Sequence, residues 1–260
     1  MDKLETFVAD NRFTISVIFP LVGAFTFIAS AEGILPQFLE FNPFFILFGT
    51  LVMRLPLISG LKPLIDKKAA VGLALITFYA YFIEYIGLKT GWPYGSFEYL
   101  IELGPMILGV PIGLPIFFVP LVLNAYLLVN LFEVKNRVKR FILSLSLVLI
   151  VDGVLDPAAV SLGIWKYSSG LYYGVPVSNY LGWILSASIV LIILEIIFEA
   201  SEVRERLENV DFMLDDFVSF VFLWGLVNLY YLNIVPAVLA LLIGVLLYRT
   251  DRFSFALKSS

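Results

Sequence analysis

Residues 141–160 read FILSLSLVLIVDGVLDPAAV, an apolar run about as long as one membrane-spanning helix. A helix needs about 20 mostly apolar residues to cross the hydrocarbon core of a bilayer. Two aspartates, Asp152 and Asp156, interrupt this run, and Pro157 follows them directly. A charge near the bilayer centre costs at least ~2.5 kcal/mol. We therefore expect these aspartates to be buried in protein, paired with other groups, or functional.

The composition of the whole chain indicates an integral membrane protein. Its 260 residues are 60% hydrophobic and 15% charged, whereas soluble domains are about 45–50% apolar and about 25% charged. The chain has no Cys, which excludes a disulfide framework, and no His, the commonest general base and metal ligand. Acid–base chemistry must therefore use Asp, Glu, Lys, Tyr or water. The sequence has no basic stripe of the kind that would indicate a nucleic-acid partner.

Eight segments are apolar enough to be membrane spans, and no linker divides them. We expect an all-α, polytopic membrane helix bundle that forms a single integral membrane domain over residues 1–260. Four prolines fall within 105–120, and each removes a helical hydrogen-bond donor, so this part is predicted to be broken or re-entrant. The expected spans are about 13–30, 42–60, 69–88, 106–132, 139–160, 178–200, 214–231 and 233–250.

Lysine and arginine gather in alternate connections between these spans. They follow the second, fourth, sixth and eighth spans, whereas the other connections hold only Lys89 and Lys166. Short loops rich in Lys and Arg lie in the cytoplasm. We therefore predict a multi-pass protein of the cell membrane with both termini cytoplasmic. In this orientation Glu84, Asp152 and Asp156 lie toward the outer side.

The spacing of the two aspartates suggests an acid–base pair. Residues i and i+4 share a helix face, with Cβ atoms about 5–6 Å apart. Two carboxylates so close in a low dielectric cannot both ionise cheaply, so one is expected to keep its proton near neutral pH. Pro157 cannot donate to the Gly153 carbonyl, which loosens the helix there. The alternative is a structural polar cluster at a helix break.

Several other polar and aromatic residues have a structural interpretation beside a functional one. Glu84, in YAYFIEYIG, is either a third site carboxylate or the partner of Arg54. Arg54 lies toward the cytoplasmic end of its span and Glu84 toward the outer end, so direct pairing is not expected. The charged end of Arg54 is expected to extend toward water instead. Asn179 either caps the sixth span or belongs to the site. Glu102 is either a solvated loop charge or a site residue, and Trp165 is consistent with an aromatic belt.

Several catalytic motifs are missing from the chain. It has no glycine-rich nucleotide fingerprint, no P-loop and no HExxH motif. DGVLD matches the DxxxD of some membrane prenyltransferases, but the companion Asn/Asp-rich motif is lacking. This match is therefore a weak signal.

Two longer blocks resemble the carotenoid biosynthesis membrane-protein family, whose characterised members include carotenoid hydratases. In EYIGLKTGWPYGSFEYLIELGPMILGVPIGLP (84–115), an acid precedes the pattern T-G-x-P-[FY]-G-x-[FY]-x-Y and a G-V-P element. The second block joins DGVLDPAAVSLGIWKY (152–167) to GLYYGVPVSNYLGW (170–183). Their order and spacing fit the chain between the third and sixth spans.

The resemblance implies a hydro-lyase that adds water across the terminal C=C bond of an acyclic carotenoid, with no cofactor and no metal. The implied partners are a long acyclic carotenoid or related isoprenoid and membrane lipid. A carboxylic acid can protonate the alkene, and carboxylates can stabilise the tertiary carbocation. We expect Asp152 and Asp156 to form the catalytic pair, with Glu84 assisting. The residues expected to orient water or substrate are Asn179, Tyr99, Tyr173, Glu102 and Trp165.

Two other classes of function stay open from the sequence. One is another isoprenoid enzyme, because the same carbocation would cyclise with a different neighbour, or a prenyltransferase. The second is a transporter or a membrane protein that binds lipid or carotenoid. A transporter would more often contain an inverted repeat, and none is evident.

Overall fold

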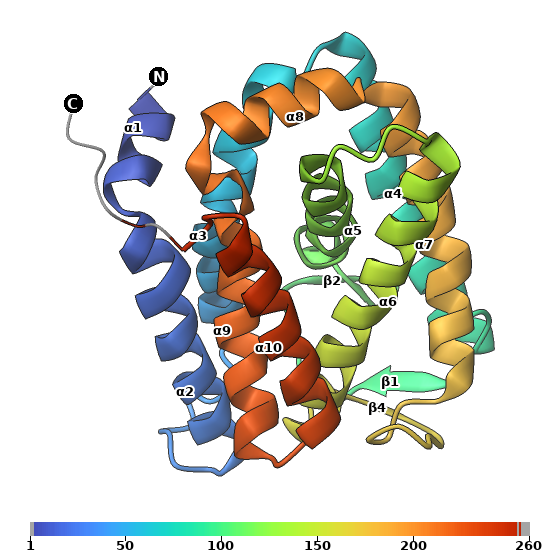
Figure 1. Cartoon of the computed structure of the whole chain (residues 1–260). Helices are drawn as coiled ribbons and strands as arrows, with labels where there is room; N and C mark the ends of the chain where they lie inside the picture. Colours follow the sequence, from blue (N-terminus) through green and yellow to red (C-terminus); the bar gives the residue numbers. More distant parts are fainter. Residues whose placement is uncertain (1–2, 254, 256–260) are drawn as a thin grey trace.

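A computed structural model describes residues 3–253 and 255 of the chain. Over these residues it is a bundle of ten α-helices with two short antiparallel β-ribbons (Figure 1). Seven helical segments are long and apolar enough to cross a membrane. The expected polytopic membrane bundle is therefore confirmed.

The seven spans match the first seven expected from hydropathy, with shifted ends. The first combines a π-helical turn with the following helix, and the second and seventh each include a 3₁₀ turn. In chain order they are Thr14–Ile18 with α2 (Phe19–Ala31), α3 (Pro43–Leu61) with Lys62–Leu64, α4 (Lys67–Thr90), α5 (Leu114–Leu131), α6 (Arg137–Ser161), α7 (Val177–Ile197), and Asp211–Leu214 with α9 (Asp215–Tyr230).

The last expected span is shorter than the others. Helix α10 (Ile234–Arg249) is apolar but has only 16 residues. It packs beside α9 after a turn over 231–233, so the two form a helical hairpin (Figure 1).

Two polar helices lie outside the expected spans. Helix α1 (Lys3–Asp10) precedes the first span, and α8 (Ala200–Asn209) crosses the upper end of the bundle between α7 and α9 (Figure 1). In α8, Val203 and Leu207 are buried. Their i, i+4 spacing gives one apolar face on a charged helix, which hydropathy over a membrane-length window does not detect.

The proline-rich segment is broken, as expected, and the break is a β-hairpin. Strands β2 (Met106–Ile107) and β3 (Val110–Pro111) pair antiparallel around Leu108 and Gly109. Both turn residues have positive φ, at 54° and 89°, which is the backbone of a two-residue hairpin turn. Helix α5 therefore begins only at Leu114, eight residues later than the expected span at 106.

Helix α5 is the most enclosed of the spans. Every residue from 121 to 130 is buried, because α3, α4, α6, α7 and α8 all pack against this helix. A helix that is apolar on all sides is expected in such a central position.

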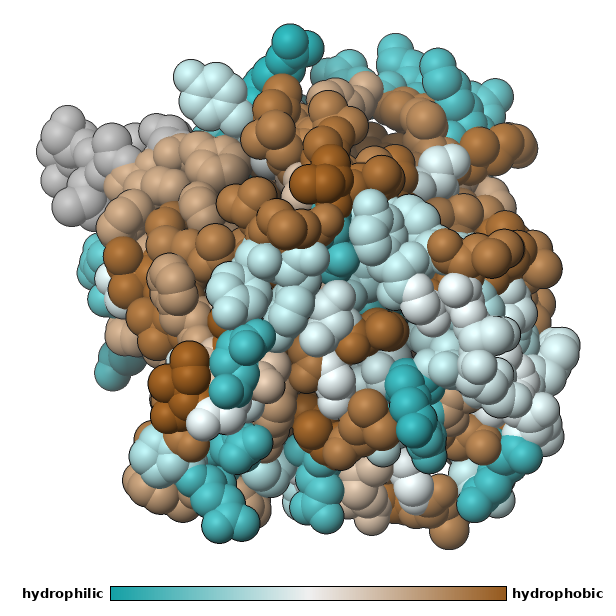
Figure 2. All heavy atoms as spheres, turned by 90° about the horizontal axis from the view of Figure 1, so that it is seen from below, coloured by the Kyte–Doolittle hydropathy of each residue, from teal (hydrophilic) through white to brown (hydrophobic). Residues whose placement is uncertain are grey.

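The connections divide between two ends of the bundle. Helix α1, helix α8 and the C-terminal end of α10 lie at the upper end in Figure 1, whereas strands β1 (Phe97–Tyr99) and β4 (Trp165–Tyr167) lie at the lower end. Seen from below, the molecule carries scattered hydrophilic residues among hydrophobic residues and residues of intermediate hydropathy (Figure 2). The aromatic-rich connections thus cover the lower end of the helices.

Candidate active site

The two aspartates of α6 are buried and face the same neighbour. Asp152 is 1% exposed and Asp156 is 4% exposed. The Asn179 side-chain amide donates to Oδ2 of both, at 2.9 Å for Asp152 and 2.6 Å for Asp156. The i, i+4 spacing therefore brings the two carboxyl groups to one point, where a single amide group binds both.

Asn179 lies in the first turn of α7 but does not cap that helix. The cap position is occupied by Pro176, without a side-chain hydrogen bond. The Asn179 side chain instead joins α7 to α6 through the aspartates. The N-cap interpretation of Asn179 is therefore wrong.

Tyr167 completes this cluster and was not among the expected site residues. Its hydroxyl oxygen lies 2.8 Å from Asp156 Oδ2 and 3.0 Å from Asn179 Oδ1. Burial raises the pKa of Tyr167 well above its ordinary value, and the nearby carboxyl groups raise it further. The hydroxyl therefore keeps its proton at neutral pH and is a hydrogen-bond donor within this cluster.

A two-stranded ribbon carries Tyr167 and a second tyrosine into the site. Strands β1 and β4 pair antiparallel, with Tyr99 opposite Trp165 and Glu98 opposite Lys166. Glu98 and Lys166 are exposed and form an ion pair of 2.8 Å. Because side chains alternate across a strand, the neighbours of these two residues point inward. The inward residues are Phe97, Tyr99, Trp165 and Tyr167.

Glu84 of α4 meets this ribbon at Tyr99. The Tyr99 hydroxyl donates to Glu84 Oε1 at 2.5 Å, and Glu84 is 8% exposed. Burial raises the pKa of Tyr99 well above its usual range, and Glu84 adds to this effect. Trp165 packs edge-on against the Tyr99 ring, with centroids 6.2 Å apart. Glu84 and Asp156 are thus each bound by one tyrosine of the same ribbon.

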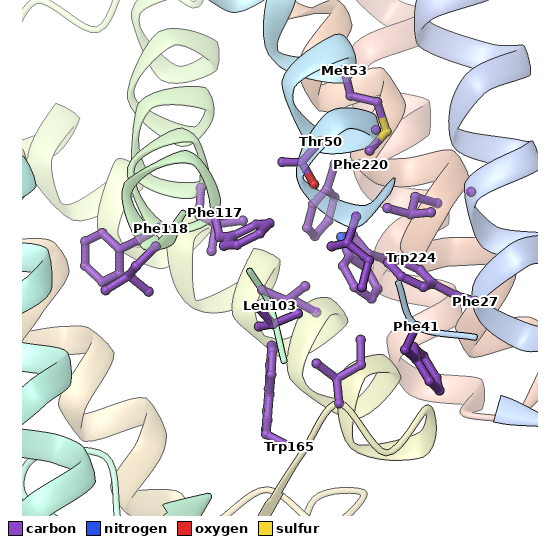
Figure 3. A pocket seen from close by; sticks show the side chains of 18 of the residues that line it. Phe27, Phe41, Thr50, Met53, Leu103, Phe117, Phe118, Trp165, Phe220 and Trp224 are labelled. Atoms are coloured by element: carbon purple, nitrogen blue, oxygen red, sulfur yellow. The ribbon is translucent and has the colours of Figure 1, made fainter. Parts of the chain in front are cut away.

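These groups line one end of an apolar cavity of about 430 Å³. Figure 3 shows Trp165 and Leu103 at its lower end, Thr50 and Met53 at its upper end, and Phe27, Phe41 and Trp224 along one side. Of the carboxyl pair, only Asp156 lines the cavity, together with Glu84 and Asn179. Asp152 therefore lies behind Asp156. Among the described residues, no group of three or more His, Cys, Asp or Glu could hold a metal ion.

The helix continues through Pro157, and a tyrosine takes over the freed carbonyl. Pro157 leaves Gly153 without its helical donor. The Tyr172 hydroxyl donates to the Gly153 carbonyl oxygen at 3.1 Å. A residue of the loop after β4 thus supplies the hydrogen bond that Pro157 cannot donate to the helix between the two aspartates.

Two of the expected site residues lie away from the cavity. Glu102 is exposed on the connection after β1. The Tyr173 hydroxyl accepts a hydrogen bond from the backbone N–H of Val235, at 3.2 Å. Neither residue lines the cavity. The structure therefore does not bring Glu102 or Tyr173 to the carboxyl groups of the site.

A second buried charge cluster corrects the expectation for Arg54. Its guanidinium does not extend to water but binds Asp216 of α9 at 2.5 Å and the Ile116 carbonyl at 3.0 Å. Asn124 of α5 donates to the other Asp216 oxygen, also at 2.5 Å. Asp216 was not identified from the sequence. Its position within an expected membrane span could have indicated that this carboxylate has a buried partner.

The chain is similar to known proteins over almost its whole length. A family model described as carotenoid biosynthesis protein matches residues 41–247. The bisanhydrobacterioruberin hydratase of Haloarcula japonica is 53% identical over 262 residues, which cover 99% of this chain and 89% of that protein. No solved structure matches the chain.

Proposed function

The chain belongs to the carotenoid biosynthesis protein family, and from this premise we propose that it is a carotenoid hydratase. The identity to a protein named as a hydratase supports an enzyme that hydrates a carotenoid. One observation carries the proposal for this chain. Asp156, Glu84 and Asn179 lie together at the end of a cavity that is otherwise mostly apolar and aromatic.

Asp156 is the proton donor in this proposal, because it is the aspartate that lines the cavity. Its protonated carboxyl group transfers H⁺ to the less substituted carbon of the terminal C=C bond. The π electrons form the new C–H bond, and the neighbouring tertiary carbon becomes a cation. Asp152 shares the Asn179 amide with Asp156, so it acts as a positioning residue that favours one proton on the pair.

Glu84 is the proton acceptor in the second step. The oxygen of a water molecule attacks the tertiary cation and forms the new C–O bond. The water then loses a proton to the Glu84 carboxylate, which Tyr99 holds in place. Return of a proton to Asp156 and loss of one from Glu84 restore the starting state. The net reaction adds one H₂O to one C=C bond.

We propose that no cofactor takes part. Addition of water to an alkene transfers no electrons and no activated group, so an acid and a base are sufficient. Hydration by the purified protein is expected to survive dialysis against EDTA. Loss of activity with EDTA and recovery with one divalent metal would contradict this part of the proposal.

The proposed orientation follows the loop charges. The basic connections lie with α1 and the C-terminal end of α10 at the upper end of the bundle (Figure 1). With that end in the cytoplasm, the carboxyl groups lie toward the outer side of the membrane.

A pigment profile tests the proposed function. The chain is expressed in bacterial membranes that contain lycopene or bisanhydrobacterioruberin, and extracts are separated by chromatography with mass detection. The expected product gains one water per modified end, and Asp156→Asn abolishes it. An isomer of unchanged mass would indicate cyclisation instead. Unchanged pigment in membranes that contain folded protein would contradict hydration of these carotenoids.

A further inference from the structure

We propose that the carotenoid enters sideways from the lipid through a mouth between α2 and α3, and that its chain stays in this mouth while one end reacts. This inference rests on the proposed hydratase function. It assigns the substrate chain to a part of the cavity that has no catalytic group.

Helix α2 contributes one face to this mouth. Phe19, Gly23 and Phe27 are spaced four residues apart and all line the cavity, as residues on one helix face do. Val22 lines the cavity too, although it is 58% exposed at the outer surface of the bundle. A residue with both properties lies where the cavity meets the surface.

Helix α3 contributes the opposite side. Phe45 and Phe48 line the cavity and are 58% and 61% exposed. Gly49 lies next to them, and a Cβ added there would meet only the Phe19 ring, at 3.7 Å. Little side-chain volume therefore fills the space between Gly49 and α2.

Aromatic contacts frame this narrow region at both ends. Toward the N-terminal end of α2, the Phe19 and Phe48 rings meet edge-on with centroids 6.3 Å apart. Toward its C-terminal end, Phe27 stacks on Phe41 at 6.3 Å and on Trp224 at 6.0 Å. Figure 3 shows Phe27, Phe41 and Trp224 together on this side of the cavity. The opening is thus framed by flat rings, with glycines Gly23 and Gly49 between them.

The size of the cavity requires such an opening for a long substrate. Its volume of about 430 Å³ lies in the range of pockets for drug-sized ligands, about 300–1,000 Å³. An extended carotenoid is comparable in length to the ~30 Å hydrocarbon core of a bilayer. The cavity holds the reacting end, and the remaining polyene must lie outside it. An apolar chain is stable in lipid, so a mouth that faces lipid is the favourable exit.

Substitution of Gly49 tests the mouth. Gly49→Phe places a ring in the opening, and Gly49→Ala is the smaller step. The matched control is Leu51→Phe, because Leu51 is 45% exposed on α3 and does not line the cavity. Each purified variant is assayed with lycopene and with geranylacetone, a short isoprenoid that ends in the same group.

The mouth predicts a loss that depends on chain length. For Gly49→Phe, kcat/KM for lycopene is expected to fall about 10-fold, mainly through KM, since chain binding is removed rather than chemistry. Geranylacetone, which fits inside the cavity, is expected to lose much less. Leu51→Phe is expected to behave as wild type with both. An equal loss for both substrates, or no loss in folded Gly49→Phe, would overturn the proposal.

Pigment retention separates this inference from the proposed function. Protein is purified from lycopene-containing membranes, and retained pigment is measured by visible absorbance. Wild type could retain lycopene without hydrating it, while Gly49→Phe retains less. This result would support the proposed mouth and contradict the proposed hydratase function. Equal retention by wild type and Gly49→Phe would overturn the mouth.

Discussion

At the scale of single residues, Asn179 determines the arrangement of the acid pair. Its one amide nitrogen binds an oxygen of each aspartate, and its carbonyl oxygen faces Tyr167. Two carboxyl groups that share one donor are forced close together without a cation between them. One retained proton would relieve their repulsion, and in the proposed mechanism this is the proton that Asp156 transfers to the alkene.

Asp156→Asn is expected to lower hydration by at least about 10²-fold, because general acid catalysis contributes about 10²–10⁴-fold. The amide keeps the size of the side chain but cannot deliver the proton. Conversion is measured by chromatography of pigment from purified protein. The matched control is Glu98→Gln, the same kind of change on the exposed face of the ribbon. Comparable activity of Asp156→Asn and Glu98→Gln would remove Asp156 from the acid role.

Tyr167 is expected to keep its proton in the folded protein at alkaline pH. Burial disfavours the charged tyrosinate, so the pKa of Tyr167 lies well above the ordinary value of 10.0. Ultraviolet titration of tyrosinate up to about pH 11 should therefore be the same for wild type and Tyr167→Phe. The unfolded chain releases this proton near pH 10, so the free energy of unfolding is expected to decrease above that pH. A tyrosinate titration step below about pH 11 that folded wild type shows and folded Tyr167→Phe lacks would contradict the raised pKa of Tyr167.

The sequence predicted the aspartate pair and included Asn179 among the site residues, but it did not identify Tyr167. Asp152 and Asp156 are conspicuous because carboxyl groups are rare in apolar spans and their spacing alone fixes a shared face. Tyr167 is one of 13 tyrosines, and its role depends on the pairing of β1 with β4. The register of strands far apart in the chain cannot be derived from local spacing, so this partner was not identified.

At the scale of secondary-structure elements, prolines acted in two ways. The prolines of 105–120 were expected to break the fourth span, and the break is the β2–β3 hairpin before α5. Pro157 was expected to loosen α6, yet α6 continues to Ser161, and Tyr172 donates a hydrogen bond to the freed Gly153 carbonyl. The effect of a proline therefore depends on tertiary contacts as well as on the local sequence.

The Arg54–Asp216 pair ties α3 to α9 inside the bundle, and breaking it is expected to be costly. Arg54→Met leaves the buried Asp216 without a cation and should lower the free energy of unfolding by about 3–5 kcal/mol. Arg54→Met with Asp216→Asn removes both charges and retains an acceptor for Asn124, so it should recover most of this loss. Denaturant unfolding in detergent measures both.

An exposed pair provides the control for this experiment. Lys166→Met breaks the Glu98–Lys166 ion pair, whose side chains are 58–63% exposed, and should cost about 1 kcal/mol or less. If the double variant at Arg54 and Asp216 is as unstable as Arg54→Met alone, an unpaired buried charge is not the cause.

At the scale of the whole molecule, hydropathy and charge predicted the layout well. The alternating basic connections all lie at the end of the bundle that carries α1 and the C-terminal end of α10 (Figure 1). Helices α1 and α8 were missed because their apolar residues form a stripe rather than a continuous run. The cavity could not be predicted either, because its walls come from segments between Phe19 and Trp224.

The absence of cysteine from the chain allows a direct test of orientation. Leu171→Cys places one thiol in the loop before α7, where Leu171 is 95% exposed. Lys135→Cys places one in the basic connection between α5 and α6. A membrane-impermeant maleimide should label Leu171→Cys in intact cells and Lys135→Cys only after permeabilisation, because Lys- and Arg-rich loops stay in the cytoplasm. Wild type gives the background. The reverse pattern would place the carboxyl groups toward the cytoplasm, and the water and protons of the reaction would then come from that side.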